Sequence, residues 1–256
     1  MSDLHVVHAG PPDGTPIVWL GSLGSSTAMW DPQIAAFAGR HRCILIDHPG
    51  HGASPPSIVP VTIESLGDGV LSALDDVGAK RAHVVGLSLG AMIAMELAAH
   101  HPERIDRLAL LCTSAHFDSP DPWNERAATV RSGGMTEVAY AVVARWLTPD
   151  YTAANPDEVA AFVTMLHAVD PESYARCCEA IAAMDQREQL PSIQVPTLVI
   201  VGSHDPATPP SHGETIADLI PGAQLETVES AHLANWEQAD AVNRLLDQHL
   251  EGTADD

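Results

Sequence analysis

Residues 86–90 read Gly86-Leu87-Ser88-Leu89-Gly90 and lie between a strand-like and a helix-like segment. The apolar run 82–85 before them predicts a buried strand, and residues 91–101 after them, rich in Ala, Met, Ile and Leu, predict a buried helix. The pattern G-x-S-x-G in this context is typical of a nucleophilic serine on a strained turn. Such a turn leaves no room for a Cβ at position 86 or 90. A glycine-rich turn with a passive serine is the alternative, so the rest of the chain must supply the context.

Composition and charge narrow the class of protein. The 256 residues are 45% hydrophobic, which indicates a globular chain with a large core. A formal net charge of −22 argues against nucleic acid and anionic membranes as partners, because both would repel it. No apolar run reaches membrane-spanning length and residues 1–5 lack a signal peptide's features, which predicts a cytoplasmic protein. The four cysteines lack the spacing of metal ligands, and we expect them to be small buried hydrophobic residues. They are Cys43, Cys112, Cys177 and Cys178.

The first 115 residues alternate between strand and helix patterns. This rhythm predicts an α/β fold with a mostly parallel central sheet and helices on both faces. Asp31-Pro32 is expected to begin a helix, with the aspartate as its N-cap. The strands are expected at residues 4–8, 17–20, 42–47, 82–85 and 108–112, and the longer helices at 62–77 and 91–101.

The rhythm breaks at residue 116 and returns only near residue 191. Between them the sequence predicts helices at 123–131, 137–147, 156–167 and 171–184, and no strand. Asn155 and Glu158 are expected to form a capping box. We therefore expect an all-helical lid at 116–190 over a core made of 1–115 and 191–256. That core resumes with strands at 196–201 and 224–228 and helices at 211–220 and 237–250.

Three residues follow predicted strands in the chain order serine, acid, histidine. They are Ser88, Asp205 and His232, and this is the order of the α/β-hydrolase fold. Ser88 would attack an acyl carbon, His232 would move the proton, and Asp205 would orient the imidazole. Asp205 capping the next helix is the alternative, which the intervening prolines disfavour. Thirteen other histidines exist, but only His232 follows the last strand in this way.

The chemistry of an acyl transfer also needs donors for the oxyanion. The loop 21–26 after the strand at 17–20 consists of small residues, and the fold takes one donor from this loop and one from the residue after the nucleophile. These would be the backbone amides of Leu23 and Leu89, unless the loop is an ordinary flexible one. His48 and His51 suggest a metal only weakly, because no third ligand is evident. We expect no metal and no organic cofactor.

Over nearly its whole length the sequence resembles the 3-oxoadipate enol-lactone hydrolases (β-ketoadipate enol-lactonases). The G-x-S-x-G turn at 86–90 and the catalytic triad of Ser88, Asp205 and His232 are shared by many hydrolases, whereas the lid segments are more specific. The sequence departs from the family at Gly21, where relatives often have a polar residue, and at His48-Pro49, which replace an aspartate or threonine and an arginine. The segments that carry the resemblance are Gly21-Ser22-Leu23-Gly24-Ser25, Met29-Trp30-Asp31-Pro32-Gln33, Gly86-Leu87-Ser88-Leu89-Gly90, Thr113-Ser114-Ala115, Trp123 with Arg126-Ala127, Arg145-Trp146-Leu147-Thr148-Pro149, Tyr174 with Cys178-Glu179-Ala180-Ile181, and His232-Leu233-Ala234-Asn235.

The resemblance implies hydrolysis of 3-oxoadipate enol-lactone to 3-oxoadipate in the β-ketoadipate pathway of aromatic compound degradation. The substrate would be a small anionic lactone, so a carboxylate-binding arginine is wanted in the lid. Arg126, with Trp123 and Trp146 as apolar walls, is the expected substrate-binding set. The arginines within 116–190 are Arg126, Arg131, Arg145, Arg176 and Arg187.

Two other functions fit the same residues. A broad carboxylesterase or a carbon–carbon bond hydrolase would use the same triad, because only the lid selects the substrate. A ligand-binding protein that keeps the fold with slow turnover is a rival from another class, and the intact triad speaks against it. The sequence does not indicate an oligomeric state.

Overall fold

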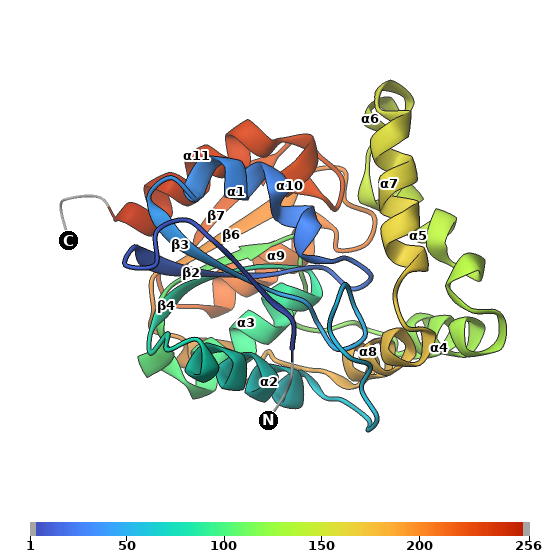
Figure 1. The fold of residues 1–256 in the computed structure, drawn as a ribbon, viewed down its shortest axis with the longest axis horizontal. Coiled ribbons are helices and arrows are strands. Elements are labelled where there is room, and N and C mark those ends of the chain that lie inside the picture. The colour runs from blue at the N-terminus through green and yellow to red at the C-terminus, as the bar shows by residue number, and fades with distance from the viewer. Residues whose placement is uncertain (1–3, 253–256) are drawn as a thin grey trace.

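A seven-stranded sheet organises the molecule (Figure 1). The structure is a computed structural model that describes residues 4–252. The strand order is β1-β3-β2-β4-β5-β6-β7, and β1 alone runs antiparallel to its neighbour, so the sheet is mostly parallel as predicted. The strands are β1 (Val6–Ala9), β2 (Thr15–Leu20), β3 (His41–Ile46), β4 (Ala82–Leu87), β5 (Ile105–Leu111), β6 (Thr197–Gly202) and β7 (Gln224–Val228).

Helices cover both faces of this sheet. The helices α1 (Asp31–Phe37) and α11 (Ala239–Glu251) lie on one face, and α2 (Ile63–Asp76) and α3 (Leu89–His100) lie on the other (Figure 1). Helix α9 (Pro210–Leu219) packs on β6 and β7, and the short α10 (Ala234–Glu237) precedes α11. No helix within residues 4–252 combines the length and apolarity needed to cross a bilayer.

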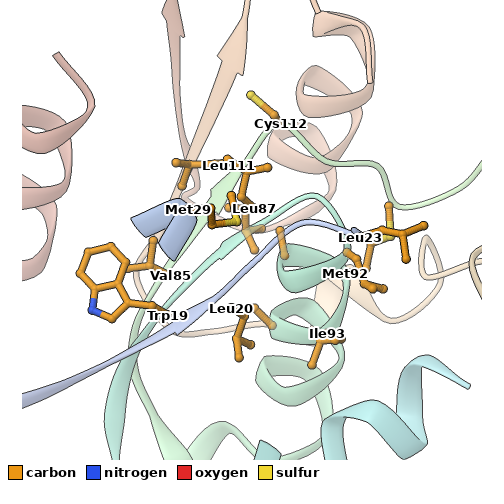
Figure 2. Close-up of a cluster of buried hydrophobic side chains, with 14 of the residues drawn as sticks. Trp19, Leu20, Leu23, Met29, Val85, Leu87, Met92, Ile93, Leu111 and Cys112 are labelled. Atoms are coloured by element: carbon orange, nitrogen blue, oxygen red, sulfur yellow. The ribbon is translucent and has the colours of Figure 1, made fainter. Parts of the chain in front are cut away.

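The buried core includes the junction where β2 and β4 meet α3. Every residue of β4 is buried, as expected of a central parallel strand, and α3 is apolar on nearly all sides because it lies between the sheet and α2. Figure 2 shows Trp19 and Leu20 of β2, Val85 and Leu87 of β4, and Met92 and Ile93 of α3 in this cluster. This packing makes the junction of β4 and α3 a rigid base for whatever the junction carries.

The segment 116–190 contributes no strand to the sheet and carries five helices beside it. They are α4 (Asp121–Gly133), α5 (Ala139–Trp146), α6 (Pro149–Ala154), α7 (Pro156–His167) and α8 (Pro171–Ala183). In Figure 1, α4 and α8 lie side by side, and α5, α6 and α7 form a separate group. The role of this insertion as a lid is still a prediction.

Short 3₁₀ helices mark several of the connections. They are η1 (Thr27–Trp30), η2 (Pro102–Arg104), η3 (Met135–Glu137) and η4 (Leu190–Ser192). Because η1 runs directly into α1, Asp31 already has helical dihedral angles and Trp30 takes the N-cap place. The predicted N-cap role of Asp31 is therefore wrong.

Three further local predictions need correction. Helix α6 was not foreseen, since Pro149–Ala154 is too short to show an apolar period. The capping box is wrong, because the Asn155 side chain makes no cap bond to α7 and donates to the Tyr151 carbonyl at the end of α6 at 3.0 Å. Glu158 accepts hydrogen bonds from the Tyr151 hydroxyl and Trp236 Nε1, both at 2.6 Å. The final helix begins at Ala239 instead of 237.

Candidate active site

Ser88 sits on a strained turn between β4 and α3. Its φ of 56° and ψ of −116° are unusual for a residue with a side chain, and the same sign of φ occurs at Cys112, just after neighbouring β5. A Cβ on Gly90 would lie 2.0 Å from the Leu20 carbonyl oxygen, and one on Gly86 would lie 2.5 Å from the Ala91 nitrogen. The predicted need for glycine at both positions is confirmed. The turn holds Ser88 at the carboxyl edge of the sheet.

The backbone of Ser88 is held on both sides, whereas its hydroxyl is free. Its N–H donates to the Leu111 carbonyl at 2.9 Å, and its carbonyl accepts from the Thr113 hydroxyl at 2.9 Å. Within residues 4–252 the Ser88 hydroxyl has no hydrogen-bond partner, and His232 Nε2 has none either. Both side chains line the same cavity. The serine is therefore fixed in place and its oxygen is open to a ligand.

Asp205 and His232 form a buried pair beyond β6 and β7. Asp205 Oδ2 lies 2.7 Å from His232 Nδ1, so the imidazole donates through Nδ1 and presents Nε2 to the cavity. Burial on its own would raise the pKa of Asp205, but the charge and hydrogen bond of His232 and the bonds from Thr208 outweigh it and lower that pKa. Asp205 is thus held ionised, as a partner for an imidazolium.

Thr208 completes the surroundings of Asp205, and the sequence analysis missed it. Its hydroxyl donates to Asp205 Oδ2 at 2.7 Å and lies 3.4 Å from His232 Nδ1. The backbone N–H groups of Ala207 and Thr208 donate to Oδ1 at 2.7 and 3.1 Å. Asp205 thereby closes an Asx-type turn instead of capping α9, whose N-cap is Pro209. The Asp-Pro-Ala-Thr-Pro sequence was the available signal.

The two predicted oxyanion donors are unpaired amides. Leu89 is the first residue of α3, where an amide has no partner within its helix, and Leu23 lies in the loop after β2. No hydrogen bond from either amide occurs among the described residues. The loop is braced by Gly90 N–H, which donates to the Gly21 carbonyl at 3.0 Å, and by Ser25 N–H, which donates to the Ser22 carbonyl at 3.1 Å. Leu23 and Ser88 line one cavity.

This cavity lies between the carboxyl edge of the sheet and the helical insertion. The structure brings the three predicted substrate-binding residues to it, since α4 contributes Trp123 and Arg126 and α5 contributes Trp146. The Arg126 guanidinium lies 4.6 Å from the centre of the Trp123 ring, a cation–π distance. Arg145 of α5 also lines the cavity, although the sequence analysis did not single it out.

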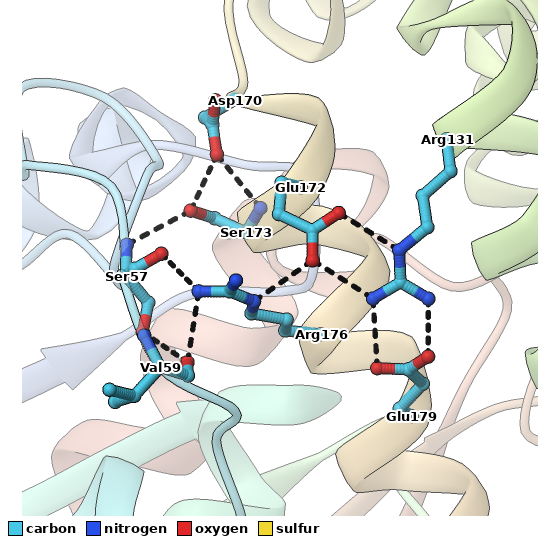
Figure 3. A network of polar contacts seen from close by, with 8 residues as sticks. All are labelled: Ser57, Val59, Arg131, Asp170, Glu172, Ser173, Arg176 and Glu179. Atoms are coloured by element: carbon cyan, nitrogen blue, oxygen red, sulfur yellow. Dashed lines mark hydrogen bonds and ion pairs between the residues drawn. The ribbon is translucent and has the colours of Figure 1, made fainter.

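The arginines of the insertion divide into two kinds. Arg131, Arg176 and Arg187 each pair with a carboxylate, and Figure 3 shows Arg131 between Glu172 and Glu179. Within the described chain, Arg126 and Arg145 pair with no carboxylate. Burial and the charge of Arg126 lower the pKa of Arg145, whose guanidinium donates to the Pro206 carbonyl at 2.9 Å. Two cations thus face one cavity without an ion-pair partner among the described residues.

His48 and His51 lie in the loop after β3 and are engaged internally. His48 Nε2 donates to the Gly21 carbonyl at 2.8 Å, and His51 Nδ1 lies 2.9 Å from the Pro49 carbonyl oxygen. Burial, with the neighbouring His48 charge, lowers the pKa of His51 to about 4. No cluster of three potential metal ligands occurs within residues 4–252.

Comparisons with known proteins show which family this chain is similar to. Residues 15–155 match the family model described as alpha/beta hydrolase fold, and residues 168–255 match one described as TAP-like protein. The chain is 35% identical to 3-oxoadipate enol-lactonase 2 of Acinetobacter baylyi, over 93% of this chain and 89% of that protein. It is 31% identical to a candidate carbamate hydrolase of Azorhizobium caulinodans, over 91% and 90%.

A solved structure gives the same result. The crystal structure of the enol-lactonase from Burkholderia xenovorans LB400 superposes with a TM-score of 0.95 at 39% identity, covering 97% of this chain and 96% of that one. The fold, the mostly parallel sheet and the similarity to enol-lactonases predicted from the sequence are confirmed. By its family match, its similarity to these hydrolases and its architecture, the chain belongs to the α/β-hydrolase family.

Proposed function

We propose that this protein hydrolyses a small anionic lactone, 3-oxoadipate enol-lactone, through an acyl-enzyme on Ser88. The observation that carries the proposal is the presence of Arg126 and Arg145, neither in an ion pair among the described residues, in the cavity that Ser88 and His232 also line. In a protein of net charge −22, two such cations together attract a carboxylate specifically to this place. The similarity to enol-lactonases supports the same substrate.

The first half of the reaction forms the acyl-enzyme. His232 Nε2 takes the proton of the Ser88 hydroxyl as its oxygen attacks the lactone carbonyl carbon. The amides of Leu23 and Leu89 would stabilise the oxyanion of the tetrahedral intermediate, a contribution of about 10²–10³ in rate for each donor. The ring C–O bond of the acyl group then breaks as protonated His232 gives its proton to the leaving enol oxygen, which returns the imidazole to its neutral form. Because the freed enol tautomerises to the ketone, ring opening is hard to reverse.

The second half releases the acid. A water that gives its proton to His232 attacks the acyl carbon, and the protonated imidazole, stabilised by ionised Asp205, returns the proton to the Ser88 oxygen. The product is 3-oxoadipate, a dicarboxylate, and no cofactor is needed for either half. In this proposal the protein serves the β-ketoadipate pathway of aromatic compound degradation.

The test is the loss of ultraviolet absorbance of freshly generated 3-oxoadipate enol-lactone, with this protein and with its Ser88→Ala variant. Rapid loss that disappears in the variant supports both the substrate and the nucleophile. No loss, together with turnover of p-nitrophenyl acetate, identifies another ester or a carbon–carbon bond as the target. Failure of both substrates, without labelling of Ser88 by an organophosphonate, supports a slow-turnover ligand-binding protein.

A further inference from the structure

The loop that carries His232 is fixed at both of its flanking amides. The N–H of Leu233 donates to the carbonyl of Trp146 at 2.8 Å, across to the end of α5 in the insertion. The N–H of Ala231 donates to Glu237 Oε2 at 2.6 Å. The backbone on either side of the histidine is therefore held by groups outside the loop.

Glu237 extends this attachment into the insertion. Its second oxygen, Oε1, accepts the Thr148 N–H at 3.0 Å and the Thr148 hydroxyl at 2.5 Å. Thr148 is also the N-cap of α6, because its hydroxyl accepts the Tyr151 N–H at 3.3 Å. One half-buried carboxylate thus joins the amide next to His232 to the corner between α5 and α6.

The site requires a carboxylate in particular. Three donors converge on the two oxygens of Glu237, and a carboxylate is the side chain that accepts on both ends. A glutamine at this position would direct an NH₂ group at one of these donors and lose that bond. Neither Glu237 nor Thr148 lines the cavity with Ser88. Their contribution to turnover must therefore pass through another residue.

We propose that Glu237 is a positioning residue: it connects the backbone beside His232 to residues 146–148 of the insertion and so fixes the position of the imidazole. The proposal rests on the proposed function, in which His232 moves the proton. In this proposal Trp146 and Thr148 help to hold the catalytic histidine in position. The distance between residues 146–148 and His232 stays constant while other parts of the insertion move. A displacement of such a general base by about 1 Å can lower the rate by up to about 10²-fold.

The experiment compares Glu237→Gln, Thr148→Val and Thr148→Ser in the full-length protein with p-nitrophenyl acetate, a neutral ester. We expect Glu237→Gln to lower kcat about 10- to 100-fold with KM changed less than about threefold, because proton transfer suffers and the cavity does not. Thr148→Val should lower kcat less, and Thr148→Ser, which keeps the hydroxyl, should restore it. Since both act on one connection, the double variant of Glu237→Gln with Thr148→Val should be no slower than Glu237→Gln alone.

Glu158→Gln is the matched control. Glu158 is another half-buried carboxylate that joins the insertion to α10, through Tyr151 and Trp236, but it contacts neither amide beside His232. It should lower thermal stability about as much as Glu237→Gln while kcat stays within about twofold. Rates are normalised to the concentration of folded sites, determined by circular dichroism for each variant.

The outcomes separate this proposal from the proposed function. Equal kcat in Glu237→Gln and Glu158→Gln, a loss confined to KM, or additive losses in the double variant would overturn the role of Glu237. If Ser88→Ala is inactive while Glu237→Gln is unimpaired, the triad stands and this inference fails. If Ser88→Ala keeps its turnover, both fail.

Discussion

The two halves of the helical insertion are held in place by different chemistry. Helices α4 and α8 form one half, in which the exposed charges of Arg131, Glu172 and Glu179 join the two helices to each other. This half reaches the core through Arg176, which donates to the carbonyls of Ser57 and Val59 (Figure 3). Helices α5, α6 and α7 form the other, fastened by Glu158 and Glu237 through bonds to uncharged donors.

The difference indicates which half can move without cost to the proton transfer that we propose for His232. Exposed ion pairs are worth little each and are screened by salt, whereas half-buried hydrogen bonds to a carboxylate are stronger and less sensitive to salt. The half beside His232 has the stronger kind. We infer that α4, which packs on α8, supplies an adjustable wall of the cavity and that α5, in the half with α6 and α7, supplies the fixed one.

The largest expected effect is at Gly50, where the core loop meets α8. Its φ is +72°, its carbonyl accepts the Asp170 N–H at 2.9 Å, and an added Cβ would lie 2.3 Å from the Ser173 Cβ. Gly50→Ala should therefore cost about 3 kcal/mol, from left-handed strain plus overpacking, and should loosen α8. Urea unfolding measures the loss.

Gly78→Ala is the control for this change. Gly78 has φ +71° but nothing within 4 Å of an added Cβ, so it should cost only the strain, about 1 kcal/mol. If Gly50→Ala lowers the free energy of unfolding no more than Gly78→Ala does, α8 can shift freely at this contact. The half made of α4 and α8 would then be more loosely attached than we infer.

The next effect tests whether both walls bind the substrate. Arg126 comes from α4 and Arg145 from α5, and each is expected to contact the lactone carboxylate. Arg126→Ala and Arg145→Ala should each raise KM for the lactone about 10- to 100-fold, the value of a charge-assisted hydrogen bond, and change KM for a neutral ester little. Steady-state kinetics with both substrates gives the comparison.

Arg187→Ala is a suitable control, since Arg187 pairs with Asp185 away from the cavity. Equal KM changes for the lactone and the neutral ester would contradict a carboxylate-binding role. An effect of Arg126→Ala alone would assign the carboxylate to the α4 wall.

The residues of this site that depend on local sequence could be predicted, whereas those that depend on contacts between distant segments could not. Ser88, with glycines at positions 86 and 90, could be identified because the strained turn leaves its requirement in adjacent residues. The pairing of Asp205 with His232 followed from the order of strands in one fold. Of the five arginines, Arg126 was singled out through the family resemblance and Arg145 was not, because which arginines pair with a carboxylate depends on tertiary contacts such as those between α4 and α8.

The same reason explains the local errors. Glu158 has the spacing of a capping box with Asn155, yet its carboxylate bonds to Tyr151 and Trp236, the second of which lies 78 positions away. A local pattern predicts the local partner and has no information about a distant competitor. Thr148 and Glu237 were invisible for this reason as well.

Acid should act on the core and leave the ion pairs of the α4 and α8 half in place. Burial lowers the pKa of His83 and of His249 to about 4, while the hydrogen bond from Arg131 lowers the pKa of Glu172 to about 2. The unfolded chain takes up protons on these histidines below pH 6.5 and the folded one does not until about pH 4, so stability falls as pH falls through this window. The charged or titratable groups facing them are Arg81, Asp106, Arg107 and His41.

The expected loss is about 2 kcal/mol for each histidine between pH 7.5 and pH 5. His249→Gln keeps a donor for the Leu108 carbonyl, which His249 Nε2 contacts at 2.9 Å, and removes the titration. Urea unfolding at both pH values should show a smaller pH effect in this variant. An unchanged pH effect would place the acid-sensitive groups elsewhere.

The smallest effect is expected at Arg131, and it tests the comparison most directly. The Arg131 side chain is 37% exposed and those of Glu172 and Glu179 are each 43% exposed, so Arg131→Gln should cost less than about 1 kcal/mol. Hydrogen exchange should nevertheless quicken in α4 and α8 and stay unchanged in α5 to α7, and 0.5 M NaCl should do the same to the unmodified protein. Arg187→Gln, which breaks an exposed pair outside this network, should change neither half. An equal increase in the hydrogen-exchange rate of all five helices would mean that the insertion moves as one body. Every motion of the cavity wall would then also displace His232.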